Sequence, residues 1–532
     1  MTASLPPSVG SRDPRRWLVL AVMSVGTLIV FLDGTVINTA LPNISTKLSA
    51  TTSQLQWVVD SYILVLAGLL LLGGTLGDRF GRRRWMSVGL LVFGAGSVLG
   101  GLSNSIESLI AARAVQGLGA ALVLPATLSI VTNVFERDER AKAIAIWTAV
   151  GGLGVGLGPA VGGFLVENWD YNAAFWIHIP ILSLAGLGMF FVPESRDPRK
   201  VGLDVPGAIT GTLAVSSLVY GIIQGGEAGW TSTKILVALG ISAASFVAFA
   251  VIERRAAFPM LPLRFFRRRD FTGSVVALGI VFFAGIVLFF FLSQYWQLVQ
   301  GRTPFAAGLM AVPNAAAIIV GSGVAQSLLA KVGPRRLVSS AMVIMGIGVA
   351  LFTTVDVGTS TLRMIGTLMI VGFGFGLAAQ PLTDTVMAAV PIEDAGVGSA
   401  VNDVSRELGS ALGVAIIGSI VSHFYRSNVQ TNLAGHVSPQ VMHVAREGIG
   451  VVHVAARSIQ PAEATKLISG ANAAFVDAMT TGFWISVGFI GIGLATSLLM
   501  LPRHARLTQV VRSEVDESGT VDADSSVEVT AG

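Results

Sequence analysis

Long apolar runs constrain this chain more than any other feature of its sequence. A helix of about 20 apolar residues spans the hydrocarbon core of a bilayer, and only helices or closed barrels satisfy every backbone group there. Runs of this length therefore predict transmembrane helices. We expect roughly 14 of them, at about 17–38, 55–74, 85–103, 108–130, 141–166, 174–193, 206–224, 234–252, 271–299, 305–330, 337–354, 362–390, 396–422 and 480–501.

The composition agrees with a polytopic membrane protein. Hydrophobic residues make up 52% of the 532 residues and charged ones 12%, which is too apolar for a large soluble protein. The net charge of +4 does not indicate nucleic-acid binding, because the basic residues form short clusters beside apolar runs. Residues 1–13 are polar, and the run from Trp17 is too long for a signal-peptide core, so we expect the first helix to be retained.

No catalytic or cofactor site is evident. The chain has no cysteine, which excludes disulfides and thiolate chemistry. It has no phosphate-binding loop of the ATPase type, and its six histidines are scattered without metal-ligand spacing. We therefore expect no cofactor, no bound metal, no ATP hydrolysis and no enzyme activity.

The basic residues alternate between the predicted loops. If the chain starts inside, the loops after even-numbered helices carry the arginines and lysines, whereas the outer loops hold very few. By the positive-inside rule this places both termini in the cytoplasm and favours an even number of helices. The inner clusters are Arg79/Arg82/Arg83/Arg84, Arg196/Arg199/Lys200, Arg264/Arg267/Arg268/Arg269, Lys331/Arg335/Arg336 and Arg503/Arg506.

The turn at 74–85 is weakly similar in sequence to residues 330–336, as expected if the chain holds two related helix bundles. A cavity is expected between them. The domains predicted are a cytoplasmic N-terminus at 1–16, a six-helix bundle at 17–193, two inserted helices at 206–252, a second six-helix bundle at 271–501 with an outer loop at 423–479, and a disordered acidic tail at 502–532. One or two amphipathic helices are expected within that outer loop.

Four motifs resemble those of one family. The turn after the second helix contains Gly74, Gly77, Asp78, Arg79, Gly81, Arg82 and Arg83. It resembles the signature loop of the major facilitator superfamily. Residues 32–44 of the first helix (LDGTVINTALPNI), 113–120 of the fourth (RAVQGLGA) and 154–163 of the fifth (GVGLGPAVGG) resemble motifs of its 14-span drug:proton antiporters, the EmrB/QacA type. One departure is His178, where this family commonly has Asn; we expect it to be a polar exchange at an outer helix end.

The resemblance implies an all-α major facilitator fold of two six-helix bundles plus two extra helices. It also implies a proton-driven multidrug efflux transporter in a bacterial inner (plasma) membrane. Its partners would be small amphipathic, cationic substrates, protons and the lipid bilayer, and it would act as a monomer. Two alternatives stay open: export of an endogenous lipid or secondary metabolite, and a membrane sensor that transports nothing.

Three ionisable residues of the first bundle lie at matched depth. Counting the rise per residue from the outer helix ends places Asp33, Asp60 and Arg113 roughly 7–10 Å inside the bilayer. Such groups are costly in lipid, so they should face one another or a watery cavity. We expect a proton-coupling and substrate-binding site, with Asp33 as its main carboxylate. The alternative is a static ion pair that only holds helices together.

The second bundle has charges of its own. Asp403 and Arg406 share a helix face, which a structural salt bridge explains as well as a transport role does. Asp384 has no evident partner on its own helix, and we expect it to be a further proton or substrate carboxylate.

Glycines in the fifth helix predict close packing. Gly154, Gly158 and Gly162 recur every four residues, beside Gly163, and form a smooth ridge, while Pro159 permits a bend. The resemblance associates this ridge with antiport. In the turn at 74–85, Asp78 is expected to accept hydrogen bonds from a helix N-terminus or to pair with Arg82, and so to act as a gate latch as well as a topological anchor.

Overall fold

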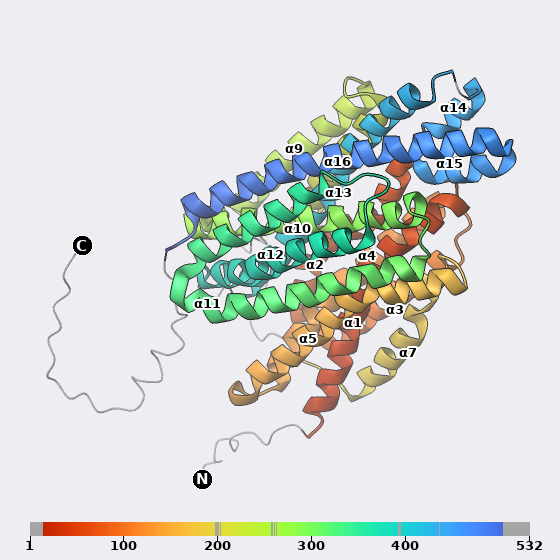
Figure 1. The fold of residues 1–532 in the computed structure, drawn as a ribbon. Helices are drawn as coiled ribbons and strands as arrows, with labels where there is room; N and C mark the ends of the chain where they lie inside the picture. The colour runs from red at the N-terminus through yellow and green to blue at the C-terminus, as the bar shows by residue number, and fades with distance from the viewer. Residues whose placement is uncertain are drawn as a thin grey trace, which may run out of the picture.

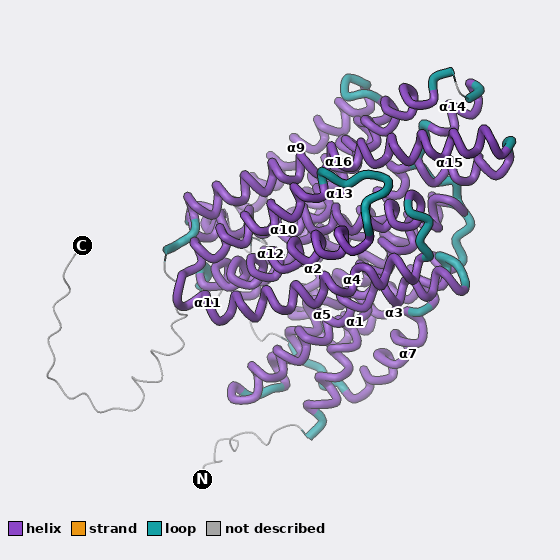
Figure 2. The backbone as a smooth tube through the Cα atoms, in the orientation of Figure 1, coloured by secondary structure: helices purple, strands orange, loops and turns teal. Residues whose placement is uncertain are grey.

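The computed structural model describes residues 14–503, apart from 197–201, 203, 257–258, 260, 262, 392–394 and 436. Helices joined by loops make up this part of the chain, and no strand is present among the described residues (Figures 1 and 2). Most of the expected N-terminal segment, the basic residues Arg199 and Lys200, and nearly all of the acidic tail lie outside the described residues.

The first bundle comprises the first seven α-helices. They are α1 (Arg16–Lys47), α2 (Thr52–Phe80), α3 (Arg82–Gly101), α4 (Ile106–Val134), α5 (Arg137–Asn168), α6 (Ala173–Trp176) and α7 (His178–Gly188), followed by the short 3-10 helix η1 (Met189–Phe191). Two further helices follow, α8 (Val205–Ala228) and α9 (Thr233–Arg255). Hydroxyl side chains cap several starts: Thr51 accepts from Gln54 N at α2, and Ser105 accepts from Ser108 N at α4.

The second bundle begins after the short helix η2 (Leu263–Arg267). Its helices are α10 (Arg269–Gln294) with the π-helical turn η3 (Tyr295–Val299), α11 (Pro304–Phe352), α12 (Thr361–Ala388), α13 (Ala395–Leu433), α14 (Pro439–Ala445), α15 (Ile449–Ala455), η5 (Ala456–Ser458) and α16 (Pro461–Met500).

The structure accounts for the number of spans expected. Among the described residues, 12 helices are long and apolar enough to cross a membrane. Two more come from α3 and from α11, which breaks at Gly333, where φ is 76°. Gly81, in the related turn between α2 and α3, also has a positive φ of 121°. Both turns therefore use a glycine in a conformation that other residues rarely adopt.

Two spans are longer than their apolar runs indicated. α13 continues to Leu433 and α16 begins at Pro461, so the outer excursion is much shorter than the expected loop at 423–479. The amphipathic helices expected there are present as α14 and α15, at the upper right of Figure 1. Polar residues at the ends of α13 and α16 hid this extension, because a helix that leaves the bilayer no longer needs to be apolar.

We call the face where α1 begins and α16 ends the inner face. At the opposite, outer face the two bundles are in close contact along α5 and α11. A Cβ on Gly308 of α11 would lie 2.1 Å from the Pro159 carbonyl oxygen, and one on Gly163 would lie 2.3 Å from that of Pro304. Toward the inner face α5 and α11 diverge (Figure 1). The arrangement is that of a transporter closed at the outer face.

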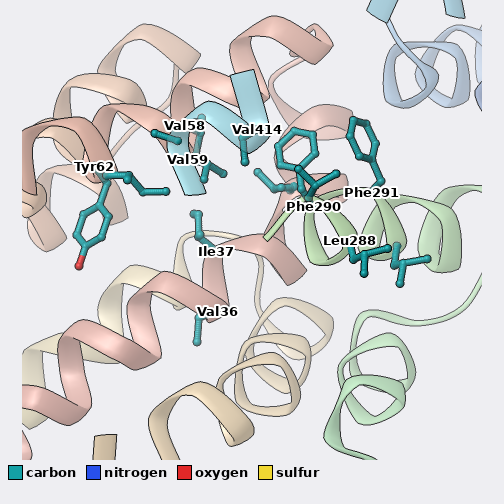
Figure 3. Packing of buried hydrophobic residues seen from close by; sticks show 14 of the residues in the cluster. Val36, Ile37, Val58, Val59, Tyr62, Leu288, Phe290, Phe291 and Val414 are labelled. Atoms are coloured by element: carbon teal, nitrogen blue, oxygen red, sulfur yellow. The ribbon is translucent and has the colours of Figure 1, made fainter. Parts of the chain in front are cut away.

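Apolar side chains of both bundles also pack together at the outer face. We call this contact, together with that of α5 and α11, the outer closure. Ile37 of α1 and Val58 of α2 lie near Phe290 of α10 and Val414 of α13 in one buried cluster (Figure 3). Hydrogen bonds add to this packing: the side-chain amide of Gln56 donates to the carbonyl of Val414 at 2.9 Å, and that of Gln297 donates to the carbonyl of Thr39 at 2.9 Å.

The outer hairpin of α14 and α15 links the two bundles. A Cβ on Gly450 of α15 would lie 2.0 Å from the hydroxyl of Ser45 on α1, and the Glu447 carbonyl accepts from Thr52 N. His453 of the same hairpin has its pKa lowered from 6.5, chiefly by burial and further by Arg457, while a hydrogen bond with Asn472 opposes the shift.

Close packing of Gly308 should be needed to keep the outer face closed. The side chain of Gly308→Leu would clash with the Pro159 carbonyl oxygen, so the outer face should open more often. Because the chain has no cysteine, a single Ile37→Cys reporter can be labelled with an impermeant maleimide from the outside. We expect several-fold faster labelling in Gly308→Leu. Gly240→Leu, where nothing lies within 4 Å of the added Cβ, is the control; equal rates in both would contradict the closure assigned to α5 and α11.

Acid should loosen the outer hairpin. Because the pKa of His453 is lowered in the docked hairpin, docking favours the neutral imidazole and loses stability as the pH falls below the ordinary value of 6.5. Hydrogen exchange of α14 and α15 amides, corrected for intrinsic rates, should show lower protection at pH 5.5 than at pH 8. His453→Gln should remove most of this difference. An unchanged difference in the variant would assign it to another group.

Candidate functional site

A buried ion pair joins α1 to α4. Nη1 of Arg113 lies 2.7 Å from Oδ2 and 2.8 Å from Oδ1 of Asp33, and the two residues are 1% and 2% exposed. A buried charge pair is tolerated only when its remaining hydrogen-bonding groups are also satisfied. The sequence correctly indicated that these two residues face each other.

Nε, Nη1 and the planar face of the Arg113 guanidinium have further contacts. Nε of Arg113 donates to the Val58 carbonyl at 3.1 Å, Nη1 also donates to Oε1 of Gln116 at 2.9 Å, and the guanidinium lies over the ring of Tyr62 at 4.3 Å. Val58 and Tyr62 both belong to α2. Arg113 thereby ties three helices of the first bundle to one charge.

Glycines bring these helices close enough. A Cβ on Gly96 of α3 would lie 2.7 Å from the backbone nitrogen of Gln116, and one on Gly117 of α4 would lie 2.5 Å from the Tyr62 carbonyl oxygen. Close backbone approach of this kind is common between membrane helices. Larger residues at Gly96 or Gly117 would push α3 or α2 away from the ion pair.

His178 belongs to the same network. Its Nε2 lies 3.6 Å from Oδ1 of Asp33, and its Nδ1 lies 3.3 Å from the hydroxyl of Ser97, which also accepts from the Gln116 amide at 2.9 Å. The residue is 1% exposed and contacts Phe93 edge to face. His178 was expected only as a polar exchange at an outer helix end; the structure places it within hydrogen-bonding distance of Ser97 and close to Asp33.

Asp60 shares the layer but not the ion pair. It is 0% exposed, and neither carboxylate oxygen has a hydrogen-bond partner within the part of the chain that the structure describes. A buried carboxylate without a partner is costly, so Asp60 requires a proton or a cation. The sequence placed it at the right depth but could not show that Arg113 engages Asp33 alone.

The second bundle presents weaker pairs. Asp403 and Arg406 form an ion pair at 3.5 Å, and the Arg406 guanidinium lies 4.6 Å from the centre of the Phe282 ring. Asp384 is exposed and accepts from the Gln380 amide at 3.1 Å. The expectation that Asp384 has no partner on its own helix was therefore wrong, since Gln380 lies one turn earlier on α12.

The glycine ridge of α5 packs against α1. A Cβ on Gly154 or Gly162 would lie 3.0 Å from the carbonyl oxygen of Leu28 or Val36, and one on Gly158 would collide with the hydroxyl of Thr35. Gly163 faces α11 instead. The ridge therefore holds α5 against the helix that carries Asp33, and the neighbouring surface of α5 forms the outer closure.

The turn at 74–85 contains two separate interactions. Asp78 pairs with Arg82 at 2.8 Å, one of the partners expected for it. The start of α3, however, is capped by Glu194, whose carboxylate accepts from Arg83 N at 3.1 Å and Arg84 N at 3.3 Å. A Cβ on Gly81 would lie 2.8 Å from that carboxylate. The anion at the helix N-terminus is thus Glu194 and not Asp78.

An apolar pocket lies in the inner half of the second bundle. It holds about 360 Å³ and is lined mainly by α10 and α13, with Leu71 from α2. Its one polar residue, Ser405, donates its hydroxyl to the Val401 carbonyl. The pocket can accept apolar groups but offers them no charge.

Sequence reasoning missed Gln116, His178 and Glu194 as members of these networks. Gln116 lies within the motif at 113–120, three residues after Arg113, so helical spacing could have indicated it. His178 and Glu194 are distant in sequence from their partners, and no periodic pattern connects them.

Comparisons with known proteins agree with this architecture. The profile of the Major Facilitator Superfamily matches residues 23–414. The chain is 35% identical over 433 residues to the multidrug resistance protein Stp of Mycobacterium tuberculosis, covering 81% of this chain and 80% of Stp. It is 34% identical to the multidrug efflux pump LfrA of Mycolicibacterium smegmatis, covering 88% and 93% of the two chains.

Solved structures show the same fold. A bacterial homologue of the human lysosomal transporter Spinster, in an inward-facing and occupied conformation, superposes with a TM-score of 0.64 at 19% identity over 92% of this chain and 97% of the homologue. The fold and the profile define a major facilitator transporter. The chain belongs to the 14-span drug:proton antiporter family of that superfamily, the EmrB/QacA type. It is a multi-pass membrane protein for drug efflux and not an enzyme.

Removing one partner of the ion pair should cost more than removing both. Arg113→Gln leaves the Asp33 carboxylate buried without its cation, for which we expect a loss of about 3–5 kcal/mol in unfolding free energy. The double change Asp33→Asn/Arg113→Gln removes both charges and should lose less. Unfolding in mixed detergent micelles measures both. Equal losses would show that the charges are not coupled in the folded protein.

Proposed function

We propose that this protein exports amphipathic cationic compounds from the cytoplasm in exchange for protons. The observation that carries the proposal is the buried Asp33–Arg113 pair beside Asp60, a carboxylate without a partner among the described residues. Two acidic groups and one fixed cation in a water-poor layer can hold protons or a cationic substrate, but not both at once.

In the proposed cycle, Asp33 alternates between a carboxylate paired with Arg113 and a neutral acid. Protonation removes the charge that attracts Arg113, while the Val58 carbonyl, Gln116 and the Tyr62 ring still hold the guanidinium. The contacts between the bundles can then rearrange. The outer closure along α5 and α11 is the element that must open to release substrate.

The orientation is part of the same proposal. The arginine-rich turns at the inner face support a cytoplasmic location for both termini. Export then corresponds to loading from the inner face, where α5 and α11 diverge, and release through the outer face. Asp384 and the Asp403–Arg406 pair are proposed as secondary polar contacts of the second bundle. We further propose that the protein acts as a monomer.

Neutralising Asp33 should abolish coupling without unfolding the protein. Asp33→Asn keeps the size of the side chain and can still accept from Arg113. In everted vesicles with an imposed pH gradient, we expect wild-type protein to accumulate a cationic dye and Asp33→Asn to lose that accumulation at equal protein levels. Normal dye transport by Asp33→Asn would show that this carboxylate does not carry the proton.

A second candidate substrate is a secondary metabolite. Other relatives are named for puromycin resistance, in Streptomyces alboniger, and for tetracenomycin C resistance and export, in Streptomyces glaucescens; they are 36% and 31% identical to this chain. Their names concern natural products, and the apolar pocket suits any amphiphile. Reconstituted flux of a cationic dye, a labelled lipid and a polyketide-type antibiotic would separate these substrates.

A further inference from the structure

We propose that His178 is the group through which a proton reaches Asp33. This inference rests on the proposed proton exchange and adds a second proton-carrying residue, on a third helix, α7. An imidazole can take up a proton on one ring nitrogen and release it again, which is why histidine serves as a proton shuttle. Its position, and not its type alone, makes it a candidate here.

The geometry aims the imidazole at the carboxylate. Nε2 lies 3.6 Å from Oδ1 of Asp33, slightly too far for a formed hydrogen bond, and has no hydrogen-bond partner among the described residues. The other ring nitrogen lies 3.3 Å from the Ser97 hydroxyl, and the Phe93 ring packs against the imidazole. Ser97 and Phe93 thus fix the ring orientation, with Nε2 directed toward Asp33.

The groups around the imidazole favour a relay over a permanent ion pair. The charged side chain that His178 approaches is Asp33 on α1, which already pairs with Arg113 on α4. α3 contributes only the neutral Ser97 and Phe93. An imidazolium here would compete with Arg113 for Asp33, and burial disfavours its charge, so the proton is passed on.

The step itself is a simple proton transfer. In the outward-open state of the proposed cycle, a proton from the outer solution binds Nε2 of the neutral ring and forms an imidazolium, which passes that proton to Oδ1 of Asp33. The products are a neutral imidazole and a neutral carboxylic acid, so one positive charge has entered and none is created or lost. Arg113 then lacks its counter-charge, which is the condition for the bundles to rearrange.

The test separates exchange of substrate from proton-driven transport. His178→Asn keeps a polar side chain of similar size. In proteoliposomes we expect His178→Asn to retain substrate counterflow, which needs no net proton movement, but to lose most proton-driven uptake, at least ten-fold, with a changed pH profile. His443→Asn, at a side chain 82% exposed on α14, is the matched control.

The outcomes distinguish this inference from the proposed function. If wild-type protein shows no proton-coupled flux of any cationic dye, the proposed function fails. If wild-type protein is coupled and His178→Asn shows the same coupling and pH profile, the relay is wrong. If His178→Asn loses counterflow and coupled uptake equally at every pH, the residue is a packing element and the relay is again wrong. Proton release on dye binding in detergent provides a second measure, reduced in His178→Asn if the relay is correct.

Discussion

The rest of the structure depends on keeping one ion pair inside a membrane protein. Asp33 and Arg113 are almost fully buried, and each charge would be expensive without its partner. The surrounding helices meet that requirement together: α2 supplies a carbonyl and an aromatic face, α3 a hydroxyl, α4 an amide and α7 an imidazole. A change in the protonation of Asp33 therefore affects the packing of the whole first bundle.

Glycines of α5 and α11 place the helix that carries Asp33 and the second bundle against the same helix, α5. The ridge on α5 lets it lie directly on α1, the helix that carries Asp33, while Gly163 and Gly308 let α5 lie directly on α11 of the second bundle. α5 consequently contacts both the helix that carries Asp33 and the second bundle at the outer face. This arrangement gives a physical route by which a charge change at Asp33 can alter the contact between the bundles, since both depend on the position of one helix.

Much of the fold could be predicted from the sequence, because a segment inside the hydrocarbon core must be apolar and must satisfy its own backbone hydrogen bonds. Run length predicted the spans, and glycine with charge located the turns at Gly81 and Gly333. The ends of α13 and α16 were missed, since helix outside the bilayer need not be apolar. Counting residues from the helix ends predicted that Asp33 and Arg113 lie at the same depth. The depth of a residue does not show which way its side chain points around the helix axis. It could not show that Asp60 has no hydrogen-bond partner among the described residues, that His178 faces Asp33, or that Glu194 caps α3.

The central claim is that substrate and proton compete for the layer around Asp33. It is tested most directly by recording dye efflux and internal pH together in proteoliposomes that contain the purified protein. If the protein exchanges substrate for protons, dye leaving the compartment is accompanied by protons entering it in a fixed ratio, and Asp33→Asn abolishes the proton movement. Dye flux at an unchanged rate without any proton movement would contradict it.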